Sequence, residues 1–301
     1  EREPIILEAM EFPKPVIHVV VEPRAEEDRE QLEEALAKLA SEDPRFRVSV
    51  DEDTGQTLIA GQGELHLEII VDRLRREFRV DALVGAPRVA YRETLTERVA
   101  HREEYRRQVG ERGVYAEVEL VLEPLERGAG IEFKDETARS GVPASYVSAV
   151  EKGVLEAAES GELAGYPVTD IRVRLRELKH HEVDSNEVVF KIASNIALKR
   201  ASVKGAMVLL EPVMKVEVVV PEEFVGEVIG DLNARRGMVR GMSPRGSSQL
   251  VEAEVPLEEM FGYATDLRSR TQGRASFTMK FAHYGLMPRR LMEARTHTGK
   301  A

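Results

Sequence analysis

Seven arginines and no lysines lie between positions 230 and 274, around two apolar helix patterns that each run into cations and a glycine. They are Arg235, Arg236, Arg240, Arg245, Arg268, Arg270 and Arg274. Cations in a last helical turn suit the free carbonyls there, and glycine ends a helix, but this explains only one or two arginines per helix. Because the guanidinium fork matches phosphate geometry and stacks on bases, the pattern also favours a nucleic-acid-binding face.

The first of these patterns ends in Asn233, Arg235 and Arg236, directly before Gly237. A glycine lets another backbone approach closely because it has no Cβ. We expect one arginine of this pair to bind phosphate or stack on a base, and the other to pack or to cap the helix. Arg268 closes the second pattern and is the binding candidate there.

The segment His180-His181-Glu182-Val183-Asp184 has the residue types of a metal site. We expect no metal there, because adjacent histidines rarely bind one ion from a strand or loop and no His-x3-His spacing occurs. Glu182 and Asp184 are candidate paired acids, but nothing near them in sequence forms an apolar pocket that would separate their pKa values.

The chain contains neither a Gly-x4-Gly-Lys-[Ser/Thr] phosphate loop nor a Gly-x-Ser-x-Gly nucleophile elbow. We therefore predict no catalytic residues and no catalytic activity for this chain alone.

A chain of 301 residues is long for one core and predicts two or three domains. Its 42% hydrophobic and 32% charged content is typical of soluble, folded protein. No apolar run approaches the roughly 18 residues of a membrane span, the first residues do not resemble a signal peptide, and there is no cysteine. We expect a cytoplasmic protein without membrane contact, disulfides or cysteine-bound metal.

The net charge of −11 argues at first against a nucleic-acid partner. The acidity is concentrated, however: residues 1–88 carry −9, residues 89–205 carry −3 and residues 206–301 carry +1. The overall charge therefore leaves RNA contact open for the last two segments. An alternative is a protein-interaction scaffold in which residues 1–88 dock a basic partner and no RNA is bound.

Hydrophobic periodicity predicts the same element order in the first and last segments. In the first, we expect strands over 16–21, 46–50, 57–60 and 80–84, and helices over 28–39 and 63–78. In the last, we expect strands over 214–220, 238–243, 249–255 and 275–281, and helices over 222–235 and 256–268. The order βαββαβ is that of a ferredoxin-like unit, an antiparallel sheet covered by two helices. His66 lies on an amphipathic helix, where we expect it to pack or cap.

The segment between them has a different pattern. We expect strands over 105–109, 115–122 and 171–175, helices over 143–158 and 187–201, and polar loops over 110–113 and 178–184. The fold class is therefore α+β, with domains over 1–86, 87–205 and 206–301.

Six motifs resemble bacterial elongation factor G, in collinear order along the whole chain. They occupy residues 3–8, 63–69, 89–94, 181–185, 230–237 and 261–268. The chain resembles domains III, IV and V of that five-domain translational GTPase. The resemblance implies two ferredoxin-like modules and a middle domain of the ribosomal protein S5 domain 2-like type.

The resemblance also implies a function, which is to promote translocation of tRNA and mRNA by inserting the middle domain at the decoding site of the ribosome. It implies a cytoplasmic, monomeric protein whose partners are ribosomal RNA and proteins, tRNA with mRNA, and a GTPase domain in cis. GTP and Mg²⁺ would bind that missing domain, so this chain would need no cofactor.

The tip of the middle domain is then formed by residues 110–116 and 179–184. Gly110 and Gly113 allow a tight turn, Arg112 offers a phosphate fork and Tyr115 braces the loop. Lys179 and His181 complete the predicted RNA-binding set, since a histidine is readily protonated beside a polyanion. Asp184 is expected to fix the loop through local backbone bonds.

Three stretches of the middle domain depart from the family pattern. Residues 109–116 read Val-Gly-Glu-Arg-Gly-Val-Tyr-Ala where the family has Thr-Gly-Gly-Arg-Gly-Gln-Tyr-Gly. Residues 177–180 replace Asp-Gly-Ser-Tyr, and residues 139–143 replace Gly-Gly-Val-Ile-Pro. Glu111 places an anion where the family has glycine, which weakens attraction for RNA. A paralogue specialised for ribosome recycling, or for another role on the ribosome, is therefore the alternative function.

Overall fold

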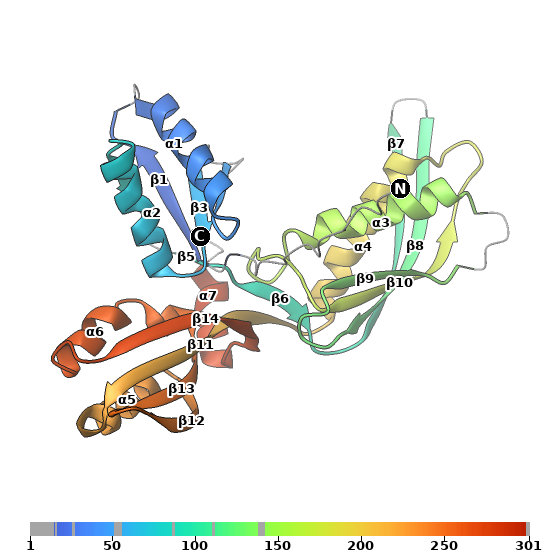
Figure 1. The fold of residues 1–301 in the computed structure, drawn as a ribbon. Coiled ribbons are helices and arrows are strands. Elements are labelled where there is room, and N and C mark those ends of the chain that lie inside the picture. Colours follow the sequence, from blue (N-terminus) through green and yellow to red (C-terminus); the bar gives the residue numbers. More distant parts are fainter. Residues whose placement is uncertain are drawn as a thin grey trace, which may run out of the picture. The chain divides into compact units, whose positions relative to one another are not determined.

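The structure is a computed structural model that describes residues 15, 17–25, 28–50, 56–85, 88–109, 112–137 and 142–298. The chain divides into two compact units, Glu1–Ala90 with Pro212–Ala282, and Tyr91–Glu211 with His283–Ala301. Figure 1 shows its three sheets, each with helices packed against it. Within the described ranges, no helix is long and apolar enough to cross a membrane.

The first segment has the predicted βαββαβ order. Its elements are β1 Ile17–Pro23, α1 Arg29–Glu42, β2 Arg47–Val50, β3 Thr57–Gly61, α2 Glu64–Glu77, β4 Ala82–Val84 and the short β5 Arg88–Val89. The sheet order is β2-β3-β1-β4, and every pair in it is antiparallel. Helix α1 buries its apolar face, which consists of Leu32, Ala35, Leu36 and Leu39. This is the ferredoxin-like arrangement that the periodicity predicts.

His66 stabilises the start of α2, as expected. Its Nδ1 accepts the backbone N–H of Gln62 at 3.2 Å, which ties the first turn of α2 to the residue just before the N-cap Gly63. Its Nε2 lies 3.2 Å from Oδ2 of Asp43, just beyond the end of α1. Asp43 in turn accepts hydrogen bonds from the Nε and NH2 groups of Arg45, at 3.0 and 2.9 Å. These contacts bring the end of α1 and the start of α2 together.

The hydrogen bond from Arg45 is the main reason that the pKa of Asp43 falls from 3.8 to about 2. A carboxyl whose pKa is lower in the folded state stabilises the fold above its unfolded pKa, and this contribution is lost as the pH falls from about 4 towards 2. We expect Asp43→Asn to cost about 1 kcal/mol at pH 6, after allowance for solvent screening, and almost nothing at pH 2. Urea unfolding followed by the amide NMR signals of α1 measures this difference; a cost independent of pH would contradict it.

The middle segment is built on a four-stranded sheet of order β7-β8-β10-β9. Its elements are β6 Arg92–Leu95, β7 Val99–Val109, β8 Arg112–Pro124, β9 Ile131–Asp135, α3 Ala144–Ala158, β10 Ile171–Lys179 and α4 Glu187–Lys204. Strands β9 and β10 are parallel and connected through α3, whereas β8 is antiparallel to both β7 and β10. The periodicity missed β6 and β9, and β10 extends four residues beyond the predicted strand.

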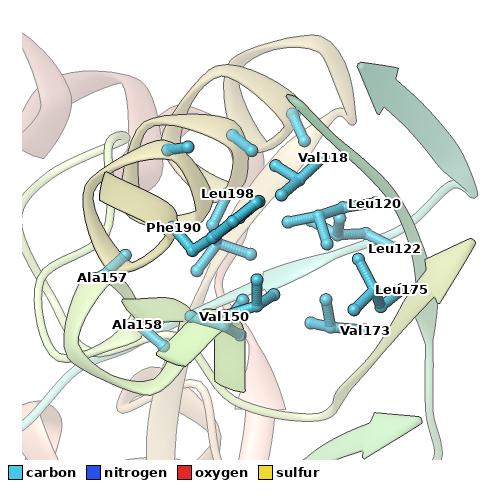
Figure 2. Packing of buried hydrophobic residues seen from close by; sticks show 14 of the residues in the cluster. Val118, Leu120, Leu122, Val150, Ala157, Ala158, Val173, Leu175, Phe190 and Leu198 are labelled. Atoms are coloured by element: carbon cyan, nitrogen blue, oxygen red, sulfur yellow. The ribbon is translucent and has the colours of Figure 1, made fainter. Parts of the chain in front are cut away.

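The core of this unit lies between the sheet and the two helices. Figure 2 shows Phe190 and Leu198 of α4 together with Val150 of α3, facing the side chains of β8 and β10. Small residues bring α3 and α4 together: a Cβ on Gly153 would lie 2.2 Å from Oγ of Ser194 and 2.3 Å from the carbonyl oxygen of Lys191. The two helices therefore leave no room for any side chain at position 153.

The last segment repeats the ferredoxin-like topology, with sheet order β12-β13-β11-β14. Its elements are β11 Met207–Pro221, the 3₁₀ turn η2 Glu222–Phe224, α5 Val225–Ala234, β12 Met238–Arg245, β13 Ser248–Pro256, the 3₁₀ turn η3 Leu257–Met260, α6 Tyr263–Arg270, β14 Ser276–Leu286 and α7 Arg289–Thr298. The prediction of one helix over 256–268 is wrong. Phe261 is extended and Gly262 is left-handed (φ 73°), so the helix begins again at Tyr263.

Candidate nucleic-acid interface

The tip of the middle domain begins with a long β-hairpin. Strands β7 and β8 pair without interruption from Val99 opposite Leu122 to Val109 opposite Arg112. Gly110 and Glu111, which connect the strands, and the side chain of Arg112 lie outside the described residues. Of the predicted hairpin residues, Gly113 and Tyr115 are described, and both lie near the free end of β8.

The predicted second segment of the tip lies against this hairpin. The backbone N–H of Tyr115 donates to the carbonyl of Asp184 at 2.9 Å. The Asp184 carboxylate faces Gly113 so closely that a Cβ there would lie 3.2 Å from its Oδ2. Gly113, Tyr115, Lys179 and His181 line one groove of about 830 Å³. The structure therefore brings together four of the predicted RNA-binding residues of the tip.

Lys179 is neutralised within the groove. Its Nζ lies 2.8 Å from Oε1 of Glu117, and this hydrogen bond raises the pKa of Lys179 and lowers the pKa of Glu117. The Tyr115 hydroxyl also donates to Glu117, at 2.9 Å, and burial raises the pKa of that phenol. The Tyr115 hydroxyl is therefore bonded within its own strand, and Lys179 already has an anionic partner.

Two cations of the groove were missed by the sequence analysis. Arg106 and Arg107 are exposed on β7, and neither forms an ion pair with a described residue. The guanidinium of Arg107 lies 5.4 Å from the centre of the Tyr105 ring. The signal was present as a basic pair beside an aromatic residue in the strand that enters the tip.

His181 is more accessible than Lys179, the other predicted cationic residue in the groove. Its side chain is 59% exposed, and its Nδ1 lies 3.3 Å from Oδ2 of Asp184. The carboxylate of Asp184 therefore orients the ring, while the carbonyl of the same residue bonds to the hairpin, as expected of a loop-fixing residue. Among the described residues, no group of three or more His, Asp or Glu side chains is arranged to hold a metal ion.

The arginine pair at the end of α5 divides into two roles. Arg235 is only 14% exposed, and its guanidinium contacts carboxylates of Asp231 and Asp266 and the carbonyl of Glu259. It also stacks 5.1 Å from the centre of the Tyr263 ring. Arg235 is thus the packing and capping member of the pair.

Arg236 has a left-handed backbone (φ 60°), and its Nε lies 2.8 Å from Oε1 of Glu259. Gly237 is required by the same helix end, since a Cβ there would lie 2.5 Å from the Leu232 carbonyl oxygen. Asn233 and Arg268 are exposed, and Arg268 has no ion pair with any residue that the structure describes. Of the predicted residues in this module, Arg268 is therefore the cation most available to a ligand.

Comparison with known proteins identifies the same three segments. Residues 12–86 match the family model of elongation factor G domain III, residues 87–206 that of domain IV, and residues 208–295 that of the elongation factor G C-terminus. A crystal structure of a protein from Thermus thermophilus is similar over 97% of this chain, with 36% sequence identity and a TM-score of 0.77. This chain covers 44% of the length of that protein's chain. The chain belongs to the elongation factor G family and contains its domains III, IV and V, in that order.

Proposed function

We propose that this chain is the ribosome-engaging portion of a translation elongation factor G-type GTPase. Its middle domain, residues 87–205, promotes translocation of tRNA and mRNA by inserting its tip at the decoding site. The observation that carries the proposal is the docking of residues 180–185 against β8, which assembles one groove at the end of the hairpin. Residues 1–86 and 206–301 are the two further domains.

The chemistry of the groove suits an RNA backbone. Arg106 and Arg107 offer phosphate two guanidinium forks that have no ion pair within the described ranges, and His181 offers an exposed ring that hydrogen-bonds a phosphate or a ribose hydroxyl. The partners in this proposal are ribosomal RNA and proteins, and tRNA with mRNA. GTP and Mg²⁺ bind the GTPase domain of such a factor, so the 301-residue chain should show no GTP turnover.

The absence of cysteine from the sequence allows a direct test. Val183 is 84% exposed at the tip, and Val183→Cys carrying an iron chelate should cleave small-subunit RNA around the decoding site when the chain is bound to ribosomes. The control is Ser269→Cys on α6, which is exposed in another module and should give a different cleavage pattern. Cleavage from position 183 that avoids the decoding site would overturn the proposal.

One observation favours a paralogue specialised for ribosome recycling: cations at and near the tip are paired with carboxylates of the same domain. Lys179 pairs with Glu117, and Arg102 is shared by Glu117, Glu119 and Glu177, which reduces attraction for phosphate. A translocation assay beside a ribosome-splitting assay, both with the full-length factor, separates the two functions. Splitting without translocation would establish the recycling role. Loss of translocation in His181→Ala, with GTPase activity retained, would establish the translocation function.

Loss of the Arg268 side chain should affect ribosome binding, whereas loss of the Arg235 side chain should affect stability. Arg268→Ala should weaken ribosome binding several-fold at low salt without changing stability, because the side chain has no ion-pair partner in the described part of the chain and phosphate contacts release counterions. Arg235→Ala should lower the free energy of unfolding by about 2 kcal/mol, because it leaves buried Asp231 without its nearest cation. Ribosome sedimentation across a salt series and thermal unfolding measure the two effects. Equal stability losses would contradict this division of roles.

A further inference from the structure

The two segments of the tip are joined by hydrogen bonds that centre on Ser185. Its Oγ donates to the carbonyl of Tyr115 on β8 at 2.7 Å. The same Oγ accepts the backbone N–H of His181 at 2.8 Å. The backbone N–H of Ser185 donates back to the carbonyl of His181 at 3.2 Å. The Ser185 hydroxyl thus connects the hairpin to the backbone of His181.

The bonds around Ser185 give the loop a second and a third point of attachment. Tyr115 uses its backbone N–H as well as its carbonyl, since the N–H donates to the carbonyl of Asp184 at 2.9 Å. On the other side, the hydroxyl of Tyr146, from α3, donates to the carbonyl of Ser185 at 3.2 Å. The Tyr146 ring also packs edge-on against His180, with centroids 5.7 Å apart. The loop is therefore held between the hairpin and α3.

This arrangement determines which atom of His181 meets a ligand. The backbone of His181 is fixed by Ser185, and its Nδ1 faces the Asp184 carboxylate at 3.3 Å. With Nδ1 directed towards Asp184, Nε2 is the ring nitrogen that remains available to a bound ligand. In neutral histidine, an Nδ1 that donates to a carboxylate leaves Nε2 as an acceptor, which suits a ribose hydroxyl; in protonated histidine Nε2 donates, which suits phosphate.

We propose that Ser185 is a positioning residue for RNA recognition: it holds His181 against the hairpin so that the two segments form one binding surface before any ligand arrives. The proposal rests on the proposed function for its ligand, and on the bonds of Ser185 alone for its mechanism. A surface that is assembled in advance loses less conformational freedom on binding, which strengthens binding without adding a contact.

The mechanism can be tested in the 301-residue chain by amide hydrogen exchange at His181 and Tyr115. Ser185→Ala removes both side-chain bonds, and we expect exchange at His181 to become roughly tenfold faster. Ser185→Thr keeps the hydroxyl and should restore most of the protection. Ser148→Ala, on the exposed face of α3, is the control for a serine-to-alanine change elsewhere in the domain. Unchanged exchange in Ser185→Ala would overturn the proposed mechanism.

The role in recognition is tested by a double-mutant cycle on ribosome affinity. Ser185→Ala should weaken binding roughly fivefold in the wild-type chain and have little effect in His181→Ala, because it acts through His181. Equal losses in both backgrounds would overturn the positioning role. If His181→Ala itself leaves ribosome affinity unchanged while exchange responds as expected, the proposed function fails at this residue and the bonds of Ser185 only stabilise the loop.

Discussion

Gly153→Ala should lower the free energy of unfolding of the middle unit by about 3 kcal/mol, because overpacking against a backbone atom that cannot move aside is costly. The added methyl carbon would lie 2.2 Å from Oγ of Ser194 and 2.3 Å from the Lys191 carbonyl oxygen. Rotation of the Ser194 side chain can relieve the first contact, but the second is relieved only if α3 moves away from α4, which opens the core shown in Figure 2. Thermal unfolding and amide exchange in α3 and α4 measure the loss.

Gly226→Ala provides the matched control. Gly226 is also in a helix, α5, but it is exposed and a Cβ there meets nothing within 4 Å. Alanine is favoured over glycine in a helix by roughly 1 kcal/mol, so this variant should be slightly more stable than the wild type. Equal behaviour of the two variants would show that the two helices are not in such close contact at Gly153.

Glu93→Ala should be at least as damaging, with a loss of about 3–5 kcal/mol. Glu93 on β6 is fully buried, and its carboxylate accepts backbone N–H bonds from Leu163 at 3.0 Å, Ala164 at 2.8 Å and Tyr166 at 3.1 Å. Removing the carboxylate leaves three backbone donors without partners, and each costs its own desolvation. The turn between α3 and β10 is thus organised around one side chain.

Thermal unfolding of Glu93→Ala and amide exchange at the three donors would measure this effect. Glu97→Ala is the control, because Glu97 follows the same strand but is exposed, and its loss should change stability by less than about 0.5 kcal/mol. Glu93→Gln keeps the shape of the side chain but turns an amide N–H₂ towards backbone donors, so it should fall between the two. A Glu93→Ala variant as stable as the control would contradict the role of these bonds.

The two ferredoxin-like modules were predictable because their apolar positions follow periods that only one element type satisfies. The break at Gly262 was not, since Met260, Phe261, Ala264 and Leu267 fit a helical stripe whether or not the helix is continuous. The interruption depends on a left-handed backbone at one glycine, which leaves no trace in the hydrophobic pattern.

The candidate site was predictable to a similar degree. The convergence of Gly113, Tyr115 and His181 followed from the family resemblance, and the structure places these residues around one groove. The sequence does not show which cations lack an ion pair, because the pairing of charges depends on the register between neighbouring strands. Arg102 stands opposite Glu119, and Glu119 stands opposite Glu177, so these acids engage Arg102 rather than the cations further along β7.

The paired charges of the tip also determine how far its electric field extends. A cation held against a carboxylate, like Lys179 against Glu117, acts as a dipole, whose potential falls off more steeply with distance than that of a single charge. Long-range steering of a polyanion then depends on Arg106 and Arg107 among the described cations of the groove. Such a tip gains little in association rate from distant attraction. For the RNA ligand proposed above, selectivity would then arise after encounter, through contacts that only a correctly shaped ligand reaches.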